Sequence, residues 1–130
     1  MRLLAVVLLS GVGALSRYGL AGVVQRRAAD PRPWGTLTVN LVGALAIGVV
    51  TGLAGAGGID QDVVVLAGSG FLGGFTTFST WMLESMRIAE EGGVAGLRAA
   101  VWNVAGMLAV GMIGVAAGVW TGAVIGAAIN

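Results

Sequence analysis

Apolar residues form long runs in this chain of 130 residues, and short polar stretches separate the runs. The runs cover about residues 3–24, 34–54, 63–86 and 96–125. Roughly 20 apolar residues are enough for a helix to cross a lipid bilayer. The pattern therefore predicts an all-α membrane protein in which residues 1–130 form a single transmembrane domain with four membrane-spanning helices.

The polar stretches carry signals that end helices. In the first stretch Pro31 and Pro33 flank Arg32, and proline stops a helix because it lacks a backbone N–H and restricts the preceding residue. Trp34 follows, and tryptophan is common at the membrane surface. Glycines and acidic residues fill the second stretch, at residues 55–62. These loops are too short to contain a separate soluble domain.

Composition supports the membrane class and excludes several others. Hydrophobic residues make up 57% of the chain, against roughly 45–50% apolar residues in soluble domains. Cysteine and histidine are absent, which removes disulfides, thiol chemistry, the usual zinc sites and acid–base catalysis by histidine. We therefore do not expect an enzyme. The net charge of +1 gives no indication of nucleic-acid binding, and we expect the lipid bilayer as the chain's partner instead.

The third apolar run differs from a plain lipid-facing helix. Between residues 68 and 81 it combines glycines with hydroxyl side chains and aromatic rings. We expect this helix to break near Gly73–Thr77. Irregular backbone at membrane depth is tolerated only where protein buries it or water reaches it, and such breaks expose carbonyl and amide groups to ions. The segment therefore indicates an ion pathway.

Polar side chains inside the predicted spans are costly in a membrane, so each one is informative. Thr36 and Asn40 are four residues apart and share one helix face, where they either bond to another helix or line a pore as donors. Arg17 either extends to the membrane surface or stands inside the first span. Glu84 either pairs with Arg87 on the helix surface or serves the pathway.

Aromatic rings recur every three residues at Phe75, Phe78 and Trp81. This spacing is common in packed helices, so core packing is one interpretation. Hydroxyl residues interleave with the rings, at Thr76, Thr77, Ser79 and Thr80. The positive edge of an aromatic ring and the donor of a hydroxyl can both contact a small anion without a full positive charge. Contacts of this kind suit conduction, which requires that an ion both enter and leave.

Three motifs resemble those of one membrane protein family. They are Gly11-x-Gly13-Ala14-x-x-Arg17-Tyr18, Gly35-Thr36-Leu37-x-Val39-Asn40-x-x-Gly43 and Gly70-Phe71-x-Gly73-Gly74-x-Thr76-Thr77-Phe78-Ser79-Thr80. In this order and at this chain length they resemble the CrcB/Fluc fluoride channels. The resemblance implies a four-helix subunit that pairs antiparallel with a second subunit, two fluoride pores, and a structural sodium ion at the centre of the dimer. It also implies passive fluoride export across the inner (plasma) membrane.

The resemblance assigns roles to individual residues. Asn40 is implied as the pore-lining amide. The implied pore also contains Thr36, Phe78, Trp81, Ser79, Thr80 and Asn103. The backbone carbonyls of Gly73 and Thr76 would hold the sodium ion, and Arg17 and Glu84 would lie at the vestibules.

Two positions depart from the family's pattern. Trp81 stands where a second phenylalanine is usual; its ring keeps a positive edge and adds an N–H donor. Asn103 is present in the fourth span, but the serine that the family commonly carries one turn later is missing. We therefore expect function with altered geometry, and expect this chain alone to line a complete pore less well than a typical homodimer.

Arginines are distributed unevenly between the two sides of the predicted topology. The first and third loops carry Arg26, Arg27, Arg32, Arg87 and Arg98. The opposite side carries only Arg2, with Arg17 counted as intramembrane. By the positive-inside rule, both termini lie outside and both loops lie in the cytoplasm. A subunit that inserts both ways needs balanced charge, so the bias favours a heterodimer with an inverted paralogue over a homodimer.

Two other classes are alternatives. A small four-helix transporter of the multidrug type needs a carboxylate in its first span, but no acidic residue precedes Asp30. A structural subunit of a heteromeric membrane complex would explain the regularly spaced glycines of the fourth span, at Gly114, Gly118, Gly122 and Gly126. It would not explain why hydroxyls and rings converge at a helix break. The sequence therefore favours passive conduction.

Overall fold

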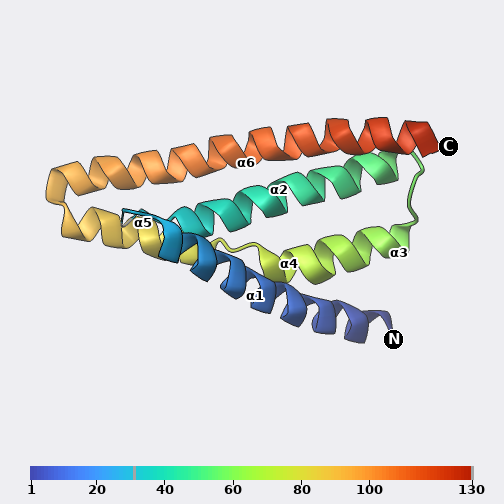
Figure 1. Ribbon diagram of the computed structural model, residues 1–130, viewed down its shortest axis with the longest axis horizontal. Helices are drawn as coiled ribbons and strands as arrows, with labels where there is room; N and C mark the ends of the chain where they lie inside the picture. The colour runs from blue at the N-terminus through green and yellow to red at the C-terminus, as the bar shows by residue number, and fades with distance from the viewer. Residues whose placement is uncertain (31, 130) are drawn as a thin grey trace.

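The computed structural model describes residues 1–30 and 32–129, and the regular elements of this part are all helical (Figure 1). They are α1 (Arg2–Arg27), α2 (Trp34–Gly55), α3 (Gln61–Val64), η1 (Val65–Leu72), α4 (Gly73–Phe75), α5 (Ser79–Glu91) and α6 (Gly93–Ile129). Pro31, where the sequence predicts a helix stop, and Asn130 lie outside the described residues.

Four helical stretches are long and apolar enough to cross a membrane. They are Arg2–Arg27, Trp34–Gly55, Gln61–Glu91 and Gly93–Ile129, with mean hydropathies of 1.7, 2.0, 1.4 and 2.0. This result confirms the prediction of an all-helical chain with four candidate membrane spans. Every stretch extends beyond the predicted apolar run at one end or both, because a helix can continue into the polar surface of a bilayer.

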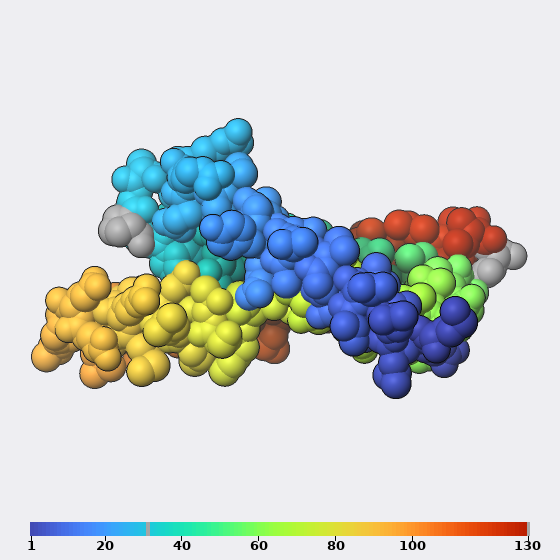
Figure 2. Space-filling view, turned by 90° about the horizontal axis from the view of Figure 1, so that it is seen from below, coloured from blue at the N-terminus to red at the C-terminus, as the bar shows by residue number. Residues whose placement is uncertain are grey.

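The helices alternate in direction, so their connections lie at two ends of the molecule. In Figure 1 the α1–α2 and α5–α6 connections lie at one end, whereas the start of α1, the end of α6 and the α2–α3 connection lie at the other. α2 and α6 run side by side (Figure 1). α1 crosses η1 and α4, and Figure 2 shows α1 lying across the third span. The arginine-rich first and third loops therefore share one end.

Glycines allow α2 and α6 to pack backbone against backbone. A methyl group added at Gly48 would collide with the carbonyl oxygen of Val115, and one added at Gly118 would collide with that of Leu45. Gly52 and Gly122 repeat this arrangement one turn further along. Small residues have this role in membrane proteins, where close packing rather than hydrophobicity holds helices together.

α1 packs closely on the irregular third span in the same way. A methyl group at Gly13 would collide with the carbonyl oxygen of Phe71, and one at Gly74 would collide with that of Ser10. The buried cluster of the chain lies next to this crossing and consists of Val39, Leu72 and Phe75. The buried cluster and the close contact with α1 therefore both support the irregular segment.

Two side chains organise the connection between α1 and α2. Asp30 accepts hydrogen bonds from the backbone N–H of Arg32 (3.0 Å) and from the indole N–H of Trp34 (2.8 Å). The bond from the Arg32 backbone is the main cause that lowers the pKa of Asp30 below its ordinary value. Gln25 donates to the carbonyl oxygen of Arg32 (2.9 Å) and accepts from the N–H of Gly35 (3.1 Å). These bonds fix the start of α2.

Candidate functional site

The backbone is irregular along the segment that the sequence singles out. η1 is a π-helix of eight residues, and α4 follows it for three residues. Thr76 is extended, with φ −80° and ψ 160°, and α5 begins only at Ser79. Irregular turns of this kind take backbone groups out of the regular hydrogen-bond ladder and are common at functional sites.

Two backbone N–H groups in this turn bind side chains. The N–H of Thr77 donates to the side-chain oxygen of Asn40 (2.9 Å), and the N–H of Thr80 donates to the hydroxyl of Thr77 (3.2 Å). In a continuous α-helix these two donors would bind the carbonyl oxygens four residues earlier, which belong to Gly73 and Thr76. In this turn the N–H groups of Thr77 and Thr80 therefore bind side-chain oxygens and not the backbone carbonyls of Gly73 and Thr76.

Asn40, on α2, closes the turn with both ends of its amide. In addition to accepting from Thr77, it donates from Nδ2 to the carbonyl oxygen of Thr77 (2.9 Å) and to the sulfur of Met107 on α6 (3.4 Å). A thioether sulfur is a weak acceptor. The amide of Asn40 thus donates to one strong acceptor, the Thr77 carbonyl, and to one weak acceptor, the Met107 sulfur. A better acceptor can replace the sulfur.

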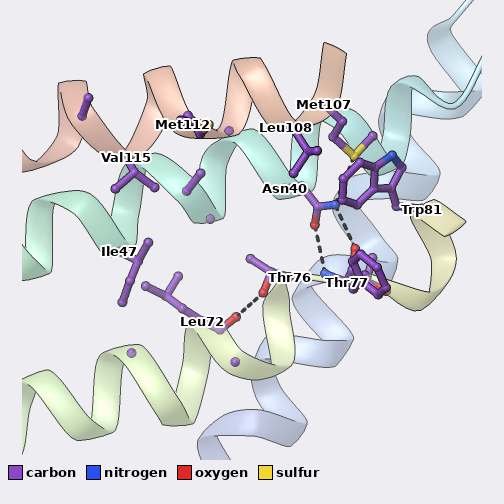
Figure 3. A pocket seen from close by; sticks show the side chains of 17 residues that line it. Asn40, Ile47, Leu72, Thr76, Thr77, Trp81, Met107, Leu108, Met112 and Val115 are labelled. Atoms are coloured by element: carbon purple, nitrogen blue, oxygen red, sulfur yellow. Dashed lines mark hydrogen bonds between the residues drawn. The ribbon is translucent and has the colours of Figure 1, made fainter. Parts of the chain in front are cut away.

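An open groove of about 750 Å³ begins at this amide and runs along α2 and α6 (Figure 3). Apolar and small residues form most of its lining: Gly43, Ala44, Ile47, Gly68, Leu72, Gly73, Phe78, Leu108, Gly111, Met112, Val115 and Ala116. Its lining among the described residues contains no charged side chain. In Figure 3, Asn40, Thr77, Trp81 and Met107 gather at one end of the groove.

The rings of Phe78 and Trp81 meet edge to face beside the groove. Their centroids are 5.5 Å apart and their planes form an angle of 89°. Trp81 is buried, with 6% of its surface exposed, whereas Phe78 is 68% exposed. The indole nitrogen of Trp81 is buried and has no hydrogen-bond partner in the described part of the chain. The two rings thus differ in environment: Trp81 is enclosed by the protein, and Phe78 is accessible to a ligand or a partner.

Hydroxyl groups form a small cluster at the start of α5. The hydroxyl of Thr77 donates to that of Thr80 (2.9 Å) and lies 3.5 Å from that of Ser79. The Thr76 hydroxyl instead donates to the carbonyl oxygen of Leu72 (3.0 Å) on its own helix. The hydroxyls that alternate with the rings in the sequence therefore do not form one continuous row: Thr77 bonds to its neighbours on α5, whereas Thr76 bonds to the backbone four residues before it.

Thr36 lies one turn from Asn40 on α2 and reaches α5. Its hydroxyl donates to Oε1 of Glu84 (2.8 Å), and Thr36 itself is 5% exposed. The second carboxylate oxygen of Glu84 is buried and has no partner among residues 1–30 and 32–129. Thr36 thus makes an interhelical hydrogen bond, whereas Asn40 both bonds to other parts of the bundle and lines the groove.

Comparison with known proteins assigns the chain to a family. The family described as "CrcB-like protein, Camphor Resistance (CrcB)" matches residues 4–119. The chain belongs to this CrcB family.

Several relatives whose names state a function match most of the length of this chain. The "Fluoride-specific ion channel FluC 2" of Mycolicibacterium paratuberculosis is 48% identical over 99 residues, 76% of this chain and 75% of the relative. The "Fluoride-specific ion channel FluC 1" of Rubrobacter xylanophilus is 44% identical over 115 residues, 88% of this chain and 87% of the relative. The protein of that name from Leifsonia xyli subsp. xyli is 37% identical over 119 residues, 92% and 85% of the two chains.

Asn103 of the CrcB chain lies apart from the first groove. Its side-chain N–H donates to the hydroxyl of Ser85 (2.9 Å), which in turn donates to the carbonyl oxygen of Trp81 (2.8 Å). Asn103 lines a second groove of about 770 Å³ between the start of α2, the end of α5 and α6. Met107 is the described residue that the linings of the two grooves share.

The structure thus brings together only some of the residues that the sequence predicts for the CrcB site. Asn40, Gly73, Thr76, Phe78 and Trp81 line the first groove. Asn103 lines the second groove. Five others lie outside the lining of both grooves, at Arg17, Thr36, Ser79, Thr80 and Glu84. Sequence reasoning missed Met107 and Ser85, which no motif marks.

Proposed function

We propose that this chain is a subunit of a fluoride channel, which lets fluoride leave the cell passively and so lowers its concentration in the cytoplasm. Its relatives are named fluoride-specific ion channels. The observation that carries the proposal is the amide of Asn40, which directs one N–H to the thioether of Met107 at the end of an uncharged groove. Fluoride is a much better acceptor than a thioether and can replace it there.

Donors without a full positive charge suit the conduction of a small anion. A lysine or arginine in the groove would bind fluoride strongly and slow its release, whereas amides, hydroxyls and ring edges bind it more weakly. In this proposal Asn40, the rings of Phe78 and Trp81, and the hydroxyls of Ser79 and Thr80 contact the anion in turn. Three further polar residues, Thr36, Asn103 and Ser85, support or extend this pathway.

The charged residues Arg17 and Glu84 have the role of vestibule residues in this proposal. Glu84 is held by the hydroxyl of Thr36 on α2. Arg17 lies half-buried on α1, outside both grooves. An arginine near the entry would raise the local concentration of anions without holding them along the pathway.

A second subunit, packed antiparallel to the first, would complete the pathway. The ring of Phe78 is 68% exposed beside an open groove, so a partner could cover both. The partner is either a second copy or an inverted paralogue, and the excess of arginine in the first and third loops favours the paralogue. The pair would lie in the inner (plasma) membrane, with these loops in the cytoplasm.

A sodium ion at the centre of this dimer would be held by the backbone carbonyl oxygens of Gly73 and Thr76. The donors that would normally bind these carbonyls, from Thr77 and Thr80, bind side-chain oxygens instead. Both residues line the groove, and Gly73 is exposed. A hard cation prefers oxygen ligands, and its charge would reduce the cost of two nearby anions.

Ion efflux from liposomes tests the proposed function. The purified chain is reconstituted alone and together with an inverted paralogue, and release of fluoride and of chloride is followed with ion-selective electrodes. We expect fluoride release far above chloride release in at least one of the two preparations, and fewer dimers when an organic cation replaces sodium. Absence of fluoride release from both preparations would contradict the proposal.

A further inference from the structure

Trp81 has a buried hydrogen-bond donor without an acceptor. The side chain is 6% exposed, and its Nε1 is buried with no partner in the described part of the chain. A buried N–H that stays unpaired is unfavourable, so such a group in a native structure calls for a ligand or a functional reason. A phenylalanine would supply an aromatic ring without this penalty.

The same end of the groove contains a second donor that is poorly satisfied. Nδ2 of Asn40 donates to the sulfur of Met107 over 3.4 Å. Asn40, Trp81 and Met107 all line this groove, and Figure 3 shows their side chains gathered at one end. Methionine is flexible and adapts its shape, so its side chain can move aside at little cost. Two poorly satisfied N–H donors, on α2 and α5, therefore belong to residues that line one groove, and the acceptor of one of them is weak and displaceable.

We infer that the indole N–H of Trp81 and the amide N–H of Asn40 together bind fluoride when the Met107 side chain moves aside. This inference rests on the proposed function. α6 offers no hydroxyl near this point, because the first serine or threonine after Asn103 is Thr121. The indole therefore supplies a donor that α6 lacks. Trp81 and Met107, which lies one turn after Asn103, line the same groove.

Proton–nitrogen NMR of the indole groups tests the contact directly. The chain has four tryptophans, and the Trp81→Phe variant identifies the Trp81 signal in protein labelled with ¹⁵N-tryptophan. Fluoride should move the Trp81 indole proton downfield by about 1 ppm or more, as expected for a charge-assisted hydrogen bond, whereas equal chloride should not. A Trp81 signal that ignores fluoride in a preparation that conducts it would overturn the inference and leave the proposed function standing. A preparation that neither conducts nor responds would contradict both.

Substitutions provide a second, functional measurement. Trp81→Phe keeps a ring and removes the donor, so half-maximal fluoride flux should need about tenfold more fluoride. Adding Met107→Ser to this variant places a hydroxyl donor at the same point and should restore most of the affinity. Trp120→Phe, on an exposed part of α6, is the matched control and should behave as the wild type. Equal fluoride dependence in Trp81→Phe and the wild type would overturn the inference.

Discussion

Asn40 and Thr77 bind each other through two hydrogen bonds of 2.9 Å, one in each direction. The pair joins α2 to the turn between α4 and α5. An amide side chain can make both bonds because it presents a donor and an acceptor on one flat group. Asn40 therefore holds the irregular turn in place and lines the groove at the same time.

Asn40→Asp should abolish fluoride flux and weaken the turn. Aspartate keeps the acceptor for the N–H of Thr77, but its second oxygen replaces the donor and repels both the Thr77 carbonyl and the anion. Loss of this partly buried bond should cost about 1–3 kcal/mol, measured by thermal unfolding in detergent. Thr51→Ala, which removes a hydroxyl bonded only to its own helix, should leave flux and stability near normal. Normal efflux from Asn40→Asp would exclude a pore-lining role.

Thr36→Val should destabilise the contact between α2 and α5. Valine leaves Oε1 of Glu84 without its donor, at a cost of about 1–3 kcal/mol. Glu84→Gln removes the charge, so the two substitutions combined should cost less than the sum of the single ones. Unfolding of the four proteins in a double-mutant cycle measures the difference. Simple additivity would mean that the two side chains do not depend on each other.

Phe78→Ile should reduce flux more than stability. The ring is 68% exposed in the single chain, so its loss removes a positive edge but little core packing. Phe75→Ile is the matched comparison, because Phe75 is 5% exposed and stacks on Phe71 with centroids 5.6 Å apart. It should lose about 1–3 kcal/mol of stability. If Phe78→Ile lowered flux and stability together, the ring would be a packing residue.

The membrane explains why the spans were predictable from the sequence. Bilayer thickness imposes a length on each apolar run, so the four candidate helices follow from hydropathy alone. The shared face of Thr36 and Asn40 also follows from their spacing of four residues. The glycines at positions 114, 118, 122 and 126 indicate close packing because their spacing repeats along one side of a helix.

The partners of the site residues were not predictable in this way. Asn40 meets Thr77 and Met107, which are 37 and 67 residues away in the chain. Ser85 meets Asn103 across 18 residues. These contacts depend on how the helices rotate and slide against one another, which is decided by packing over the whole bundle. The glycines of this segment predict an irregular helix, but its π-helical geometry over Val65–Leu72 does not follow from the sequence.

The uneven distribution of arginine predicts a fixed orientation in the membrane. The α1–α2 and α5–α6 connections lie at one end of the molecule in Figure 1, and five arginines belong to or adjoin these connections. On the other side Arg2 forms an ion pair with Asp62. Reporter fusions after the last residue of the chain should therefore report the C-terminus outside the cytoplasm in nearly every molecule.

Moving charge between the two sides should change this orientation. Replacing Arg26 and Arg27 by Gln and adding two arginines beside Asp60 turns five against one into three against three. The arginine bias of short loops sets the orientation, so balanced charge should give a mixture of both orientations. The wild-type chain should likewise conduct fluoride poorly alone and gain activity when an oppositely biased partner is co-expressed. An even split of the wild-type reporter signal, together with full activity of the chain alone, would identify an ordinary homodimer and exclude the paired-subunit arrangement.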